Sequence, residues 1–185
     1  MSIAAPHRIT PEELLEMPER DHLELLDGIL VEKNISEESS WVGSEILYHL
    51  RHALTAQPVG WVFGEGAGYR CFEDSERVRR PDVSFILRHR RPQGPLSAGY
   101  TELVPDLVVE VVSPNDLAYA VNANVEDWLA AGVPEVWVVM PRDRSLTVYR
   151  PDQQPLVLQR NEEITLAAIP AFRCEVSQFF PPRQA

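Results

Sequence analysis

The sequence has one lysine, Lys33, among seventeen basic residues, so arginine carries almost all of its positive charge. Its two cysteines, Cys71 and Cys174, lie far apart without paired spacing. This argues against a zinc ribbon or a disulfide framework and favours reduced thiols. The N-terminal residues lack the basic segment and long apolar run of a signal peptide. Apolar runs such as 136–140 are too short to span a bilayer. We therefore expect a cytoplasmic protein with no membrane partner.

Three common catalytic motifs are also missing from the sequence. It contains no glycine-rich phosphate loop, no serine in a G-x-S-x-G turn, and no histidine pair with the spacing of a zinc protease. The formal net charge of −11 argues against a general nucleic-acid coat protein, because phosphate neutralisation needs clustered lysine and arginine. An enzyme that acts on nucleic acid through a metal ion is still compatible with this charge.

The arginines are unevenly distributed along the chain. Six of them fall within fifteen residues: Arg77, Arg79, Arg80, Arg88, Arg90 and Arg91. Two interpretations stay open. The stretch is either a basic patch in an otherwise acidic protein, or a solvated edge hairpin whose charges prevent strand association.

The first third of the chain predicts a helix, a hairpin and a second helix. Thr10 and Glu13 form a capping box that begins a short helix, and Pro18 ends it. Residues 27–28, Asp-Gly, lie between two apolar runs and predict a tight hairpin turn. Apolar residues then recur at helical spacing over about 37–56, which predicts a long amphipathic helix.

The rest of the chain alternates strand-like apolar runs with one helical segment. We predict strands at 59–72 and 78–87 joined by the turn 73–76, a strand at 107–112, a helix at about 116–131 ended by Gly132, and strands at 136–139 and 146–149. The remainder, through 156–158 and 175–180, predicts edge strands and a short terminal packing segment. The strand–helix–strand unit predicts a parallel crossover. Together these elements predict one α/β domain over residues 1–185, with a mixed sheet flanked by helices.

Glu110 is the strongest anomaly, because two valines flank it on each side. The surrounding run is typical of a strand covered on both faces. An unpaired carboxylate there costs several kcal/mol, so Glu110 needs a cation, a basic side chain or an opening to solvent. A buried glutamate–arginine pair is the structural alternative.

Asp82 is the second candidate acid. It follows Pro81 near the start of an apolar strand, where the missing proline N–H suits a strand end. By itself, an aspartate after proline is more often a turn residue. Because Glu110 is expected on the next strand of the sheet, the two acids together predict a two-carboxylate site. Such a pair suits Mg²⁺ or Mn²⁺, which can activate water and stabilise a phosphoryl oxyanion.

These motifs occur in the order found in a known family. The chain carries Pro-Asp at 81–82, Glu-Val-Val-Ser-Pro at 110–114, Trp-Leu-Ala-Ala-Gly-Val-Pro at 128–134, Val-Trp-Val-Val at 136–139, Glu-Leu-Leu-Asp-Gly at 24–28, and Arg70. This ordered set resembles the Uma-two family, part of the PD-(D/E)xK nuclease superfamily, over about residues 10–150.

The resemblance implies a restriction-endonuclease-like fold and a metal-dependent phosphodiesterase whose substrate is DNA. Asp82 and Glu110 would ligate Mg²⁺ or Mn²⁺, and Glu24 would be an accessory acid. A solvated hairpin charge is the alternative for Glu24. Nucleases of this superfamily often act as homodimers, so a homodimer is a further expectation.

The sequence departs from the family at the catalytic lysine. Val112 stands two residues after Glu110, where the simplest pattern has that lysine. In the Uma-two family the lysine lies on the following helix, at a position occupied here by Asn124. Asparagine cannot carry positive charge, although it can hydrogen-bond a metal-bound water. Lys33 is the one lysine that could substitute.

Two functions therefore stay open. The first is a DNA endonuclease of impaired turnover that uses Asp82, Glu110, Asn124 and Glu24. The second is a catalytically inactive nuclease-fold protein that binds nucleic acid or a protein partner.

Overall fold

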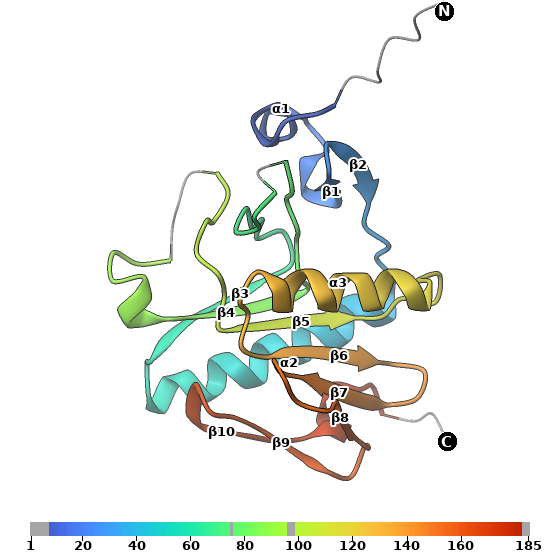
Figure 1. Ribbon diagram of the computed structural model, residues 1–185. Coiled ribbons are helices and arrows are strands. Elements are labelled where there is room, and N and C mark those ends of the chain that lie inside the picture. The colour runs from blue at the N-terminus through green and yellow to red at the C-terminus, as the bar shows by residue number, and fades with distance from the viewer. Residues whose placement is uncertain (1–7, 75, 96–98, 183–185) are drawn as a thin grey trace, which may run out of the picture.

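A six-stranded mixed sheet forms the centre of the computed structural model, which describes residues 8–74, 76–95 and 99–182 (Figure 1). Its strands, in spatial order, are β3 (Gly60–Gly64), β4 (Val83–Leu87), β5 (Leu107–Val111), β6 (Val136–Met140), β7 (Ser145–Tyr149) and β8 (Leu156–Leu158). Only β5 and β6 pair in parallel, and α3 (Ala118–Ala130) connects them. The predicted mixed sheet and parallel crossover are confirmed.

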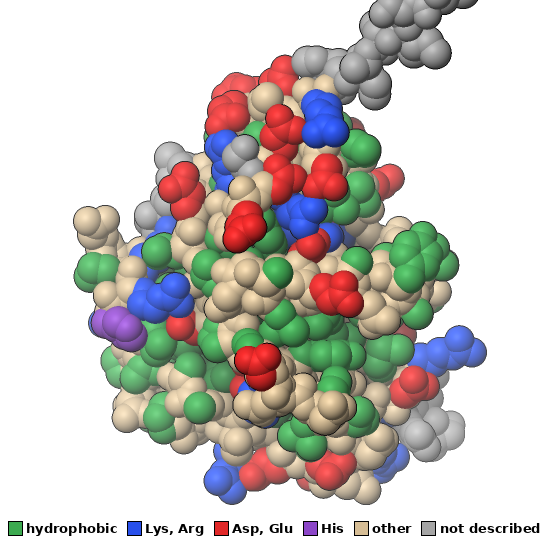
Figure 2. Space-filling view, viewed as in Figure 1, with side chains coloured by type: hydrophobic (Ala, Val, Ile, Leu, Met, Phe, Trp, Pro, Cys, Tyr) green, Lys and Arg blue, Asp and Glu red, His purple; other side chains and the backbone are tan. Residues whose placement is uncertain are grey.

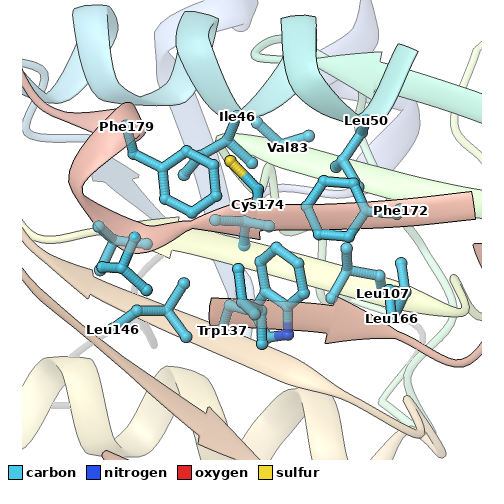
Figure 3. Close-up of a cluster of buried hydrophobic side chains, with 14 of the residues drawn as sticks. Ile46, Leu50, Val83, Leu107, Trp137, Leu146, Leu166, Phe172, Cys174 and Phe179 are labelled. Carbon is cyan, nitrogen blue, oxygen red and sulfur yellow. The ribbon is translucent and has the colours of Figure 1, made fainter. Parts of the chain in front are cut away.

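The larger hydrophobic core lies between one face of the sheet and two other elements. The first is α2 (Glu37–Ala56), whose bounds agree with the prediction, and the second is the hairpin of β9 (Glu163–Leu166) and β10 (Ile169–Glu175). Figure 3 shows Phe172 between Leu50 and Trp137 in this core. Each fully buried side chain of this size contributes about 1.5–3 kcal/mol.

The opposite face of the sheet packs against α3. Val125 and Trp128 of this helix are buried with Val108 and Val136 of the sheet. Gly132 follows the helix with φ of +93°, the left-handed conformation expected after a helix C-terminus. The sheet is therefore covered on both faces, which explains the continuous apolar runs of its central strands.

The N-terminal segment forms a small unit attached to the main body (Figure 1). It comprises α1 (Pro11–Glu16), the 3₁₀ turn η1 (Arg20–His22), β1 (Leu23–Leu26) and β2 (Ile29–Glu32). The predicted capping box of α1 is present. Asp27 and Gly28 form the hairpin turn with φ of 53° and 77°, as a two-residue turn of this type requires. A backbone bridge between Leu25 and Val78 joins the hairpin to the rest of the chain.

The predicted strands 59–72 and 78–87 are too long. They do pair in antiparallel fashion, but β3 ends at Gly64 and β4 begins only at Val83. Between them a single bridge joins Tyr69 to Arg79. Pro81 offers no N–H to a ladder, and Gly66 bends the chain with φ of +95°. The ladder is therefore interrupted just before Asp82. Ser75, in the predicted turn, lies outside the described residues.

The C-terminal part differs most from expectation. The sequence does not predict the β9–β10 hairpin, whereas the short terminal packing segment expected at the C-terminal end is present as a 3₁₀ turn, η3 (Val176–Phe179). Its apolar side chains pack into the α2 core.

The predicted helix at 116–131 begins two residues later, after Leu117. Another 3₁₀ turn, η2 (Arg88–Arg90), follows β4. Within the described ranges, no helix has both the length and the apolarity to cross a membrane.

Replacing Phe172 with alanine tests whether the β9–β10 hairpin is part of the main core. Phe172 is buried, and its removal is expected to lower the free energy of unfolding by about 3–5 kcal/mol. The control is Leu156→Ala on β8, a side chain that is 46% exposed, with an expected change within about 0.5 kcal/mol. Urea unfolding measures both. Similar stabilities of the two variants would contradict the packing described here.

Candidate functional site

A cavity of about 310 Å³ lies between the β1–β2 hairpin, the end of β5 and α3. All four candidate site residues line it: Glu24 from β1, Asp82 just before β4, Glu110 from β5 and Asn124 from α3. Lys33, which follows β2, lines it as well. The fold therefore brings together residues that are up to a hundred positions apart in the sequence.

The pairing of β4 with β5 determines where the two main carboxylates lie. Val83 pairs with Val109, so one further step along the ladder places Asp82 opposite Glu110. The Asp82 backbone N–H donates to the Val109 carbonyl at 3.1 Å. Its side-chain Oδ2 accepts a hydrogen bond from the Val111 N–H at 2.6 Å. Asp82 therefore closes the end of the ladder beside Glu110.

Glu110 points toward α3. Its neighbours Val109 and Val111 pack into the α2 core, so strand alternation turns Glu110 to the opposite face. There Trp128 Nε1 donates to Glu110 Oε1 at 2.8 Å. Burial raises the pKa of Glu110 to about 8, against the opposing effect of the Lys33 ammonium. Without a further cation, this carboxyl is therefore mostly protonated at neutral pH.

Lys33 supplies a positive charge at the site. Its Nζ donates to Asp82 Oδ1 at 2.7 Å and to the backbone carbonyl of Arg80 at 2.7 Å. Burial alone would lower the pKa of Lys33, but the charges of Asp82 and Glu110 outweigh this effect and raise it. The ammonium is therefore protonated at neutral pH. The sequence left open whether Lys33 reaches the acids, and the structure shows that it reaches Asp82.

Asn124 lies at the cavity wall, as expected from its place on α3. Within the described part of the chain, its side chain makes no hydrogen bond to Asp82 or Glu110. At this position the helix therefore contributes a neutral amide to the cavity. Lys33, in the loop after β2, contributes a positive charge.

Glu24 is held by two arginines. Its Oε1 accepts a hydrogen bond from the Arg80 backbone N–H at 2.7 Å, and its Oε2 pairs with Arg79 at 3.2 Å. Arg79 also pairs with Asp127 of α3, a residue that the sequence did not single out. Glu24 is only 7% exposed, so the interpretation as a solvated hairpin charge is wrong. Its role as an accessory acid stays a prediction.

The arginine-rich stretch is neither one basic patch nor a fully solvated edge. Arg77 pairs with Asp27 at 2.6 Å, and Arg90 pairs with Asp106 at 2.8 Å. Arg79 is buried among carboxylates. In Figure 2, acidic side chains gather over α1 and the β1–β2 hairpin, while basic ones are fewer and separated. Much of the stretch therefore serves to attach the hairpin and α3 to the sheet.

The Asp82–Glu110 pair fits a small divalent cation. Mg²⁺ prefers one or two carboxylates and keeps several waters. Asp82, just before β4, and Glu110, on the adjacent strand β5, lie at the cavity wall, and Glu110 Oε2 accepts no hydrogen bond from the residues that the structure describes. In the same part of the chain, no group of three or more histidine, cysteine or acidic side chains is placed to hold one ion. Glu24 is therefore not a third ligand in this arrangement.

Comparison with known proteins identifies the family and the fold of the chain. A family model described as "Uma2: Putative restriction endonuclease" matches residues 11–177. The chain belongs to the Uma2 family. A crystal structure of a nuclease from Anabaena variabilis ATCC 29413, itself described as putative, superposes with a TM-score of 0.79 at 22% identity, covering 93% of this chain and 97% of that one. This likeness shows that the chain described here has the same fold as the Anabaena variabilis protein. A search of curated proteins finds no match.

The raised pKa of Glu110 predicts a specific dependence of stability on pH. Between the ordinary glutamate pKa of about 4.3 and the folded value of about 8, the folded protein holds a proton that the unfolded chain releases. The stabilising effect is therefore complete below about pH 4 and is lost as pH rises through 8.

The corresponding test uses metal-free protein and the variant Glu110→Gln. Urea unfolding in the presence of a chelator is expected to show the wild type losing stability relative to the variant between pH 5 and 8, by a few kcal/mol. Lys33 does not contribute to this slope, because its raised pKa lies above the window. Parallel profiles of the two proteins would contradict a buried, protonated Glu110.

Proposed function

We propose that this protein is a Mg²⁺- or Mn²⁺-dependent DNA endonuclease in which Lys33 takes the place of the missing helix lysine. One observation carries the proposal: Asp82, Glu110 and Lys33 line a single cavity, and Lys33 Nζ lies 2.7 Å from Asp82 Oδ1. Membership of the Uma2 family supports the reaction class, hydrolysis of a phosphodiester.

Asp82 and Glu110 would hold the ion, which supplies an activated water and stabilises negative charge on the phosphate. Glu110 must lose its proton to bind, because a carboxylate ligates a metal only when ionised. Lys33 is protonated in the metal-free site, where the charge of Asp82 raises its pKa, so we do not assign it the role of general base. Its ammonium would instead stabilise charge that develops on the phosphate oxygens. Asn124 would orient a water through its amide.

A second function is favoured by the position of Lys33. Its ammonium already donates to Asp82 Oδ1 and to the Arg80 carbonyl, and thereby neutralises part of the acidic pair without a metal. If this ion pair persists, the protein is a nuclease fold without turnover that binds nucleic acid or a protein partner. A homodimer stays an expectation for both functions.

Cleavage of supercoiled plasmid with Mg²⁺ or Mn²⁺ distinguishes these functions. We expect cleavage by the wild type, loss of cleavage in Asp82→Asn, and a decrease of about 100-fold or more in Lys33→Gln, the usual effect of removing one group that stabilises the transition state. Adding Asn124→Lys to Lys33→Gln is expected to restore part of the rate, because Asn124 lines the same cavity.

Glu126→Gln is the control variant, since Glu126 lies on α3, the helix that carries Asn124, and is exposed. It should cleave like the wild type. If the wild type and an Asn124→Lys variant are both inert with either metal, the endonuclease proposal fails and the binding function is supported. Cleavage that survives Asp82→Asn contradicts the assignment of the site itself.

A further inference from the structure

A second cavity, of about 460 Å³, lies on the other side of the segment that carries Arg79 and Arg80. Arg79 lines the first cavity, whereas Arg80 lines the second. Its walls come from η1, α2, β3 and the loops around residues 66–68 and 99–101. The volume lies within the range of about 300–1,000 Å³ typical of small-ligand sites.

Four arginines from four separate segments meet at this cavity. They are Arg20 of η1, Arg51 of α2, Arg80 before β4 and Arg91 after η2. Asp21 is the only acidic residue among the described residues that line it. Such a concentration of one charge is unusual for a chain whose net charge is −11.

Neutral groups hold three of these arginines in place. Arg20 donates to the Leu15 carbonyl at 2.5 Å, Arg80 Nε donates to the Leu23 carbonyl at 3.0 Å, and Arg91 donates to Thr101 Oγ1 at 3.3 Å. The shortest approach of a carboxylate to any of the four, in the part of the chain that the structure describes, is 3.9 Å, between Arg20 and Asp21. These hydrogen bonds therefore orient Arg20, Arg80 and Arg91 without neutralising most of their charge.

Arg80 provides the clearest case. The residue is 3% exposed, yet among the described residues its guanidinium donates to the Leu23 and Gly66 carbonyls and to no carboxylate, and it lies 5.6 Å from the centre of the Tyr100 ring. Arg77 and Arg79, by contrast, pair with carboxylates. A buried cation without a countercharge is costly. An anion in the cavity would remove that cost.

The loop beside Arg80 is shaped for this close approach. Gly66 has φ of +95°, which L-residues with a side chain rarely adopt, and its carbonyl accepts from Arg80. A Cβ at Gly68 would lie 2.6 Å from the Tyr100 ring and 3.2 Å from Arg80. Gly68 therefore allows Arg80 and Tyr100 to approach the backbone at the cavity wall, and Gly66 permits the positive φ of the loop whose carbonyl accepts from Arg80.

We propose that this second cavity binds a phosphate group. Planar guanidiniums match phosphate oxygens in paired hydrogen bonds, and several of them around one cavity suit a group with more than one negative charge. The phosphate belongs either to a nucleic-acid strand or to a small phosphorylated molecule. Binding here requires neither the metal nor cleavage at the first cavity.

The test measures binding by the metal-free full chain in a chelating buffer. The probes are pyrophosphate, followed by calorimetry, and a fluorescent single-stranded oligonucleotide, followed by anisotropy. The variant Arg51→Gln/Arg91→Gln removes two charges from the cavity while leaving buried Arg80 in place. Arg142→Gln/Arg160→Gln removes the same charge from exposed positions that do not line the cavity.

We expect at least one probe to bind the wild type. Affinity should fall about tenfold or more in the cavity variant, because charge-assisted hydrogen bonds are lost, and should change by less than about twofold in the control.

Displacement of pyrophosphate by the oligonucleotide identifies a nucleic-acid phosphate as the ligand, whereas pyrophosphate binding without such displacement identifies a small phosphorylated molecule. The proposal is overturned if neither probe binds, or if the control loses as much affinity as the cavity variant. Because no metal is present, failure of cleavage at Asp82 and Glu110 has no effect on this result.

Discussion

The site depends on placing two carboxylates side by side where the β4–β5 ladder ends. Asp82 closes the ladder through the Val111 N–H, and strand alternation turns Glu110 toward α3. Burial penalises the charge on Glu110, so the site binds a proton or a cation. The Lys33 ammonium supplies part of the positive charge by donating a hydrogen bond to Asp82. Any metal that enters must share Asp82 with the ammonium or displace it.

The β1–β2 hairpin therefore contributes residues to the candidate site as well as packing against the main body. It carries Glu24 and leads into Lys33, and both contact the segment around residues 79–82. Arg79 ties the hairpin to Asp127 of α3. The same segment separates the acidic cavity from the arginine-lined one. In an acidic chain, carboxylates neutralise Arg77 and Arg79, while neutral groups hold Arg80 and Arg91.

Local patterns in the sequence predict much of this arrangement. The capping box at Thr10, the Asp-Gly turn and the 20-residue helix α2 all follow from short-range rules. Glu110 stands out because a charged residue among valines needs an explanation. Asp82 is predicted to join Glu110 because their two strands are expected to be neighbours in the sheet, and the register of β4 and β5 places the two residues opposite each other.

Other features depend on long-range contacts that no local pattern encodes. Lys33 meets Asp82 from 49 positions away, and Asp127 meets Arg79 from 48 positions away. The β9–β10 hairpin has short strands that become buried only because α2 and the sheet lie beside them. The strands around residues 65–82 were predicted too long because a proline, a glycine and competition from β1 interrupt the ladder. Tertiary contacts override propensity in each case.

Anomalous diffraction from a crystal soaked in Mn²⁺ tests the central claim most directly. The account predicts one peak within about 2.0–2.3 Å of an oxygen of Asp82 and an oxygen of Glu110. Lys33 is expected to stay in the cavity, with its ammonium moved away from the ligating oxygen. No peak at saturating Mn²⁺, with Lys33 Nζ still hydrogen-bonded to Asp82, would contradict a metal-dependent site and show that the ammonium occupies the place of the ion.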